Sequence, residues 1–230
     1  MKRFLKKLSL IIAPVLLGLI LCEMAERCPD NDYKFKNKYL TENADSIQVL
    51  ILGSSHSFFG IDPSYFDLNA FNAANVSQSL KYDYFIFDKF KDKMNSLKCV
   101  ILPISYFSLF SDLEGGIEDW RVTNYSLFYD CPYHKWELRY NLKIYNGIHP
   151  KNALFWLAGK LNSNRSCSDY GWGMSYKFED RAEQWQDSGP VAANRHTKDP
   201  VDNAVLLENC NRIENIVRYC SENNILFHLQ

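Results

Sequence analysis

A serine that follows a short apolar segment is the residue of this sequence with the clearest chemical potential. Residues 46–52 (SIQVLIL) are apolar and rich in β-branched side chains, and the chain continues as Gly53-Ser54-Ser55-His56. This pattern predicts a buried strand that runs into a tight turn. Open parallel sheets bind ligands beyond the carboxyl ends of their strands, so the Ser55 hydroxyl would stand where it can attack a carbonyl carbon. A turn that only caps a helix fits the same residues equally well.

The elements that would position this serine predict an α/β domain. Residues 71–76 form a second strand or a loop, and residues 99–104 (CVILPI) another buried strand. Between them, residues 79–94 have the pattern of an amphipathic helix that Ser79 caps, with Leu80, Tyr84 and Phe87 on its apolar side. With parallel pairing, strand, helix and strand make a right-handed crossover. Residues 202–223 predict a long helix, and residues 225–229 start a further strand.

Residues 107–200 show little periodicity, and we expect an irregular insertion with a short helix at residues 152–161. The insertion contains all the tryptophans, which could stack on sugar rings or simply pack within it. Gly171-Trp172-Gly173 predicts a turn anchored by its aromatic side chain. The tryptophans are Trp120, Trp136, Trp156, Trp172 and Trp185.

The N-terminus has the pattern of a signal anchor. Residues 1–7 contain four cationic side chains, and an almost unbroken apolar run follows from Leu8 to Cys22. We interpret residues 1–7 as cytoplasmic, 8–25 as a transmembrane anchor and 26–45 as a polar linker. The positive charges predict a single-pass protein of the inner (cytoplasmic) membrane with its C-terminal domain outside. A cleaved signal peptide is the alternative, although no small-x-small cleavage site is evident.

Composition narrows the class of protein. The chain has 230 residues, a 47% hydrophobic fraction and a net charge of −1, which fit one folded domain with no attraction for nucleic acid. None of the seven cysteines forms a Cys-x-x-Cys pair, so no metal site is predicted, and no cofactor motif appears. The cysteine spacing does not specify a disulfide pattern.

The stretch VLILGSSHSFFGIDPSYF resembles block I of the SGNH (GDSL) hydrolases. It is most similar to the membrane-anchored envelope branch, in which Gly-Ser-Ser replaces Gly-Asp-Ser. On that match Ser55 is the nucleophile and Gly53 supplies the tight turn, while Gly60, Asp62 and Pro63 match the continuation of the block. The resemblance implies a flavodoxin-like three-layer α/β fold with a parallel central sheet over residues 46–230.

The resemblance also implies where the other parts of the site lie. Residues 72–78 (NAANVSQ) correspond to block II, with Ser77 in place of the usual glycine. The backbone N–H groups of Ser55 and Ser77 would then hold the oxyanion, with Asn75 as a second donor. Block III lacks its usual asparagine, and Ser105 and Tyr106 fall at that site, either as donors or as strand-end packing. His56, next to the nucleophile, is expected in the pocket wall.

Block V of the family, Asp-x-x-His, supplies the catalytic base, and this chain contains no such stretch. The chain stops at the start of a predicted central strand, so we expect a C-terminally truncated domain. We assign no histidine as the base: Asp130 and His134 have the wrong spacing, and His196 and Asp199 the reversed order. The remaining histidines are His56, His149 and His228.

These features together predict an SGNH-type esterase or O-acyltransferase. Its substrate would be an extracytoplasmic or cell-surface glycan, or another acylated carbohydrate, and it would act through an acyl-Ser55 intermediate. One alternative is a truncated, catalytically inactive relative that lacks the base. Another is a non-catalytic membrane-anchored subunit of a polysaccharide assembly complex, with an integral-membrane acyltransferase as its partner.

Overall fold

The structure is a computed structural model, and its described part falls into two compact units. It describes residues 2–132, 137–147, 149–160, 163–176, 179, 188–196 and 202–229. Unit 1 comprises Met1–Asn31 and Trp120–Arg165, and unit 2 comprises Asp32–Asp119 and Ser166–Gln230. All the residues of the predicted active site lie in unit 2.

Unit 2 is built on a four-stranded parallel sheet in the order β2-β1-β3-β4. The strands are β1 (Val49–Ile51), β2 (Ala70–Asn72), β3 (Cys99–Leu102) and β4 (Leu226–Leu229). In the register of the central strands, Leu50 stands beside Phe71 on one side and Val100 on the other. All three are fully buried, as expected for the apolar strands of a parallel sheet. The predicted α/β class with a parallel sheet is therefore confirmed.

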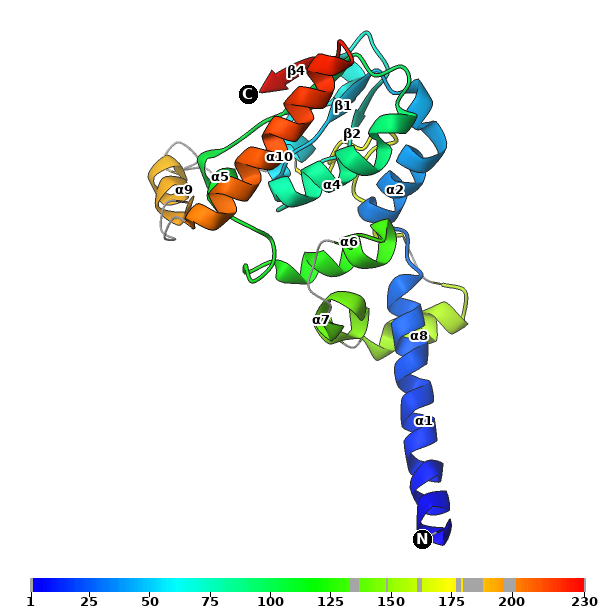
Figure 1. The fold of residues 1–230 in the computed structure, drawn as a ribbon. Helices are drawn as coiled ribbons and strands as arrows, with labels where there is room; N and C mark the ends of the chain where they lie inside the picture. The colour runs from blue at the N-terminus through cyan, green and yellow to red at the C-terminus, as the bar shows by residue number, and fades with distance from the viewer. Residues whose placement is uncertain are drawn as a thin grey trace. The chain divides into compact units, whose positions relative to one another are not determined.

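Helices α4 (Leu80–Phe90) and α10 (Asn203–Glu222) lie side by side across one face of this sheet (Figure 1). The edge of the Phe87 ring meets the Tyr219 ring at 5.4 Å between centroids and joins the two helices. Asp202 caps the start of α10, because its carboxylate accepts the Ala204 N–H. The other α-helices described in unit 2 are α2 (Asp32–Asn43), α3 (Ser55–Gly60), α5 (Tyr106–Phe110) and α9 (Ser188–His196).

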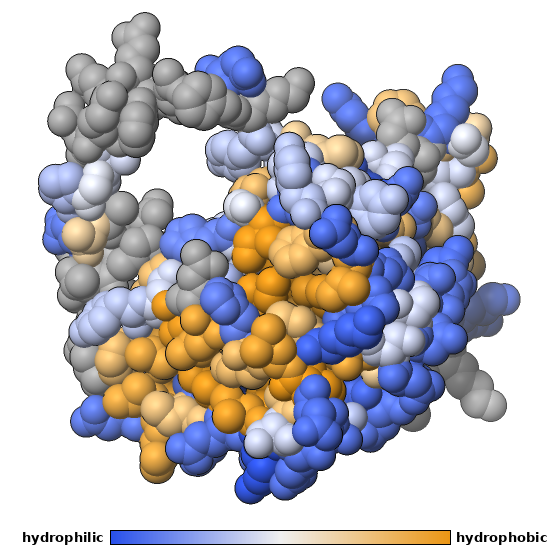
Figure 2. Space-filling view, turned by 90° about the horizontal axis from the view of Figure 1, so that it is seen from above, coloured by the Kyte–Doolittle hydropathy of each residue, from blue (hydrophilic) through white to orange (hydrophobic). Residues whose placement is uncertain are grey.

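The opposite face of the sheet is covered less completely. Val49, Ile51, Ala70 and Ile101 form its buried cluster, and the side chains that pack against them remain partly exposed. Strand β4 lies at the edge of the sheet, and its Leu226 is 65% exposed. Figure 2 shows hydrophobic side chains gathered on the face seen from above, the side of Figure 1 on which β4 lies.

Unit 1 contains the N-terminal helix α1 (Lys2–Arg27) and a group of short helices. Residues Lys6–Arg27 are long and apolar enough to cross a membrane, with only 6% of the most apolar window buried. The short helices are α6 (Val122–Tyr129), α7 (Leu138–Asn141), the 3-10 helix η5 (Lys143–Asn146) and α8 (Pro150–Leu157). Helix α8 overlaps the helix predicted for residues 152–161, but it begins and ends earlier.

Three sequence predictions need correction. The segment predicted as a linker contains α2, which buries Tyr33, Lys36 and Leu40, because these residues share one helical face. The segment 107–200 is not irregular throughout, since it contains helices α5 to α9. The buried face of α4 includes Asp83, whereas Tyr84, expected on the apolar side, is only partly buried. Charged side chains are expected at the surface by their type, but tertiary packing buries Lys36 and Asp83.

Candidate active site

Ser55 lies where the strand order of the sheet reverses. From β1 the chain passes to β2 on one side, and β3 then pairs with β1 on the other side. In sheets of this order, ligands bind beyond the carboxyl ends of the strands at that switch point. Strand β1 ends at Ile51, and Ser55 begins α3 shortly after it with its side chain half-buried. The predicted strand and turn are confirmed, and the turn stands at the edge where α/β sheets bind ligands.

The turn requires glycine at position 53. Gly53 has φ +117°, a conformation that side chains with a Cβ rarely adopt. A Cβ there would also lie 2.3 Å from the Ser57 hydroxyl oxygen. The Gly53 N–H donates to the Asp83 carboxylate at 2.6 Å. The backbone before Ser55 is therefore fixed by steric fit on one side and by a charge-assisted hydrogen bond on the other.

Asp83 is the functional candidate that sequence reasoning missed. Its carboxylate is fully buried and accepts hydrogen bonds from the Gly53 N–H and from the Gln78 side-chain amide, the latter at 2.6 Å. Burial raises the pKa of Asp83 to about 7, although both hydrogen bonds act to lower it. One signal was visible: Asp83 stands three residues after Leu80 and four before Phe87, so it lies on the apolar face of α4.

The loop after β2 supplies Asn75 and Ser77. Ser77 has φ +58°, in the left-handed region that glycine adopts without strain, so this position has the backbone of a glycine site. Its hydroxyl donates to the Glu118 carboxylate. Asn75 is buried, and its amide nitrogen donates to Gln78 at 2.9 Å rather than to open space. A chain of hydrogen bonds thus runs from Asn75 through Gln78 and Asp83 to Gly53.

The residues after β3 reach the same edge of the sheet. His56 Nδ1 and Ser105 Oγ are 3.1 Å apart, which joins the loop after β1 to the loop after β3. The edge of the Phe107 ring contacts the exposed His56 ring at 5.9 Å between centroids. Tyr106 is 58% exposed and packs on Phe110. Two of the predicted pocket residues, His56 and Ser105, are therefore in direct contact, while Tyr106 points its ring at its own helix.

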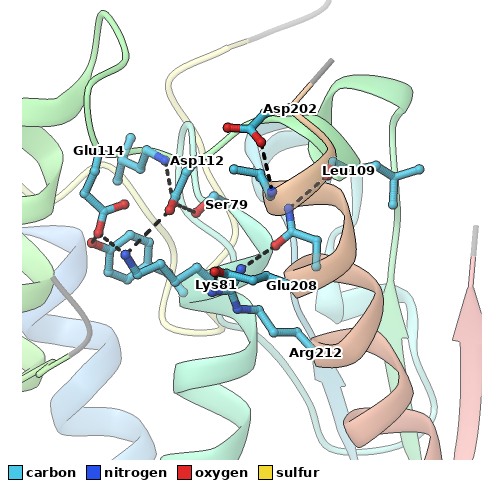
Figure 3. A network of polar contacts seen from close by, with 12 residues as sticks. Ser79, Lys81, Leu109, Asp112, Glu114, Asp202, Glu208 and Arg212 are labelled. Atoms are coloured by element: carbon cyan, nitrogen blue, oxygen red, sulfur yellow. Dashed lines mark hydrogen bonds and ion pairs between the residues drawn. The ribbon is translucent and has the colours of Figure 1, made fainter.

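An acidic segment closes over the start of α4 (Figure 3). Asp112 accepts from the Ser79 hydroxyl at 3.1 Å, and Glu114 accepts from the Tyr82 hydroxyl at 2.8 Å. Lys81 forms ion pairs with both carboxylates. Burial, followed by the hydrogen bond and charge of Asp112, raises the pKa of Glu114. With the Ser77–Glu118 bond, these contacts fasten residues 112–118 to the loop that follows β2.

A second loop, residues 166–174, forms hydrogen bonds with α3, and we call it the strap. The Trp172 indole N–H donates to the Phe59 carbonyl at 2.9 Å, which confirms the predicted anchoring role of this tryptophan. The Gly173 N–H donates to the Phe58 carbonyl at 2.8 Å. At Gly171, with φ +82°, a Cβ would lie 2.1 Å from the Asn72 carbonyl oxygen, so the strap lies directly on β2.

A buried lysine of α2, Lys36, contacts both α3 and the loop that follows β2. The Lys36 ammonium of α2 donates to the Ala74 carbonyl and lies 4.3 Å from the centroid of the Phe58 ring. Burial lowers the pKa of Lys36 to about 8, although the charges of Cys167 and Asp32 act to raise it. Asn72 contributes further, because its amide donates to the Ser57 carbonyl at 2.8 Å and to the Ile61 carbonyl at 2.9 Å. Two fully buried polar side chains, Lys36 and Asn72, therefore hold α3 and the loop that follows β2.

None of the described side chains forms a hydrogen bond with the Ser55 hydroxyl. His56 is bonded to Ser105, and His228 is exposed on β4. His149 belongs to unit 1, where it lies 3.3 Å from Glu26. His134, Asp199 and the side chain of His196 lie outside the described residues, as do Trp136 and Trp185. Among the described residues, the arrangement presents a serine at a strand end, and no histidine or carboxylate forms a hydrogen bond with its hydroxyl.

Comparisons with protein-family models, with curated protein sequences and with solved structures gave no match.

Proposed function

We propose that unit 2 is a serine esterase or O-acyltransferase of the SGNH type, with Ser55 as its nucleophile. The observation that carries this proposal is the position of Ser55, on a glycine turn at the carboxyl end of β1 and at the switch point of the sheet. The buried network behind Gly53 supports it, because a nucleophile must be held in a fixed geometry to react.

The reaction would begin when Ser55 Oγ attacks the carbonyl carbon of an acyl ester. The hydroxyl proton passes to a base, and the departing sugar hydroxyl receives a proton as the acyl-Ser55 ester forms. Water would then release the acid, or a second sugar hydroxyl would accept the acyl group. The backbone N–H groups of Ser55 and Ser77 are the proposed oxyanion donors, and the left-handed backbone of Ser77 is consistent with that role.

The glycan substrate and the location follow from the resemblance and from helix α1. An apolar helix preceded by cationic residues would tether the protein to the inner membrane and leave unit 2 on the extracytoplasmic side. Acylated polysaccharides of the cell envelope would be within its reach there. An integral-membrane acyltransferase is the proposed partner if Ser55 receives its acyl group from another protein.

Labelling with a fluorophosphonate tests the nucleophile. The full-length chain should form an adduct on the peptide that contains Ser55, as identified by mass spectrometry, and Ser55→Ala should abolish it. Ser64→Ala is the matched control, because Ser64 is an exposed serine on the segment that follows α3. Labelling that survives Ser55→Ala but is lost in Ser105→Ala would instead assign the nucleophile to Ser105, whose hydroxyl already contacts His56.

The absence of a base beside Ser55 among the described residues favours a second candidate. In that case the domain binds an acylated glycan or a partner protein without turning over substrate, because a serine without its base loses most of its rate. Failure of wild-type protein to label at any pH, together with saturable binding of an acetylated oligosaccharide that Ser55→Ala retains, would support this candidate over the first.

A further inference from the structure

Helix α8 of unit 1 has an outward face of large apolar side chains. Leu154 is 66% exposed, Phe155 50% and Leu157 63%, and none of the helix's residues is buried. Lys151, on the same face, has a long side chain that can extend away from an apolar surface. A surface helix of a water-soluble domain normally directs such residues inward, so this face marks a contact with something apolar.

The opposite face of α8 packs against α1, within the same unit (Figure 1). The Asn152 side chain donates to the Glu26 carboxylate at 2.9 Å, and His149 lies 3.3 Å from the same group. Along α1, side chains such as Val15, Leu16 and Leu17 are exposed, and partial burial starts at Gly18. The short helices therefore cover α1 only at the end of its apolar run.

Helix η5 lies beside the same part of α1. The Glu23 carboxylate accepts the Lys143 N–H at 3.1 Å and the Ile144 N–H at 2.9 Å, which fixes η5 against α1. Tyr145, between these contacts and α8, is 63% exposed. Exposed tyrosine, leucine and phenylalanine side chains in this group of short helices have the composition of a membrane–water boundary.

We infer that α8 is an interfacial membrane helix, whose Leu154, Phe155 and Leu157 insert into the outer boundary of the bilayer that α1 crosses. This inference rests on the membrane tether of the proposed function. The occupant is a lipid surface because the apolar face of α8 continues the exposed apolar surface of α1 at the end of its span. With α8 held to α1 through Glu26, the pair would fix the depth of α1 in the bilayer.

Photo-crosslinking from defined positions tests this contact. In separate full-length variants, Phe155, Leu16 and Leu207 are each replaced by p-benzoylphenylalanine. Each variant is reconstituted in vesicles of phosphatidylethanolamine and phosphatidylglycerol, and lipid adducts are measured by mass spectrometry after irradiation. Leu16 is the probe for the span itself, and Leu207, 65% exposed on α10 of unit 2, is an apolar control that is more exposed than either probe.

The inference predicts lipid adducts at position 155 with a yield of the same order as at position 16, and far fewer at position 207. Adducts at position 16 with none at position 155 would overturn it while leaving the tether intact. Crosslinks from position 155 to a second copy of the chain in place of lipid would also overturn it. No adduct at position 16 would show that α1 does not cross the bilayer, and both the tether and this inference would then fail.

Discussion

At the scale of single residues, the burial of the Asp83 carboxylate lowers the stability of the fold. A fully buried carboxylate is unfavourable without a cation beside it, and among the described residues the groups that bond to Asp83 are a backbone N–H and a neutral amide. Its neighbours on α4, Lys81 and Tyr82, make their contacts to Glu114. In return, the hydrogen bond from Gly53 to Asp83 holds the turn that carries Ser55.

Asp83→Asn should raise the free energy of unfolding above neutral pH and alter it little at acidic pH. The folded-state pKa of about 7 lies above the ordinary aspartate pKa of 3.8, so the favourable contribution of Asp83 is complete below pH 4 and is lost as pH rises to 7. The asparagine carbonyl can still accept from Gly53 and Gln78. The gain at pH 8 should be on the order of a few kcal/mol at most, and melting temperatures of the two full-length proteins from pH 5 to pH 8 would measure it.

Asp88→Asn is the control for this effect, since Asp88 is a partly exposed residue of the same helix that pairs with Lys91. It should not produce a stability gain that grows with pH. A difference between Asp83→Asn and wild type that is the same at pH 5 and pH 8 would show that Asp83 does not titrate in this range.

At the scale of elements, two distant segments are bonded to the loops around Ser55: the strap to α3, and residues 112–118 to the loop after β2 and the start of α4. Helix α3 is short and has little stability of its own, so its position depends on tertiary contacts. The strap supplies them through the Trp172 indole and the Gly173 N–H. On the other side, residues 112–118 fasten the loop that contains Ser77 (Figure 3). Parts of the chain far from Ser55 in sequence therefore determine how rigid its surroundings are.

Trp172→Phe should loosen α3 without unfolding unit 2. The substitution keeps an aromatic ring but removes the bond to the Phe59 carbonyl, at a cost of about 1 kcal/mol. Hydrogen exchange followed by mass spectrometry should then be faster in the peptide that spans residues 55–61 and unchanged in strands β1 and β3. Trp120→Phe, in unit 1, should leave exchange at residues 55–61 as in wild type; equal exchange in both variants would argue against the strap.

At the scale of the whole molecule, helix α1 is long and apolar enough to cross a membrane, and the proposed location of the protein rests on it. Its apolar window has a mean hydropathy of 2.3 and is 6% buried, so water is an unfavourable surrounding for it. Cleaved signal sequences have the same composition. Retention of the protein in the membrane therefore distinguishes an anchor from a cleaved signal sequence.

The full-length chain should remain in the membrane pellet after carbonate extraction, and Val15→Lys with Leu16→Lys should release it. Each lysine at the centre of a span makes insertion less favourable by roughly 3 kcal/mol. Immunoblots of the pellet and supernatant would measure the shift. Leu207→Lys, at an exposed apolar position on α10, should leave the protein in the pellet; release of the wild-type chain would contradict the tether.

The sequence predicted the elements around Ser55 because they are local patterns. Strands β1, β3 and β4 and helices α4 and α10 lie within the segments expected from apolar runs and helical periodicity. The glycine at position 53 and the anchoring role of Trp172 followed from residue type. Helix α2 was missed because its buried face includes a charged residue, Lys36, and helices α5 to α7 were missed because they are too short to show a clear apolar period.

By itself, the sequence predicted the strands and helices of an α/β domain, a turn with a serine at a strand end and an apolar N-terminal helix. Each of these depends on neighbours within a few residues of one another. Only the tertiary structure decided that Asp83 supports Gly53, that His56 meets Ser105 and that the strap lies on α3. These contacts join residues 30, 49 and 113 positions apart, and no local pattern of residue types encodes which of them will meet.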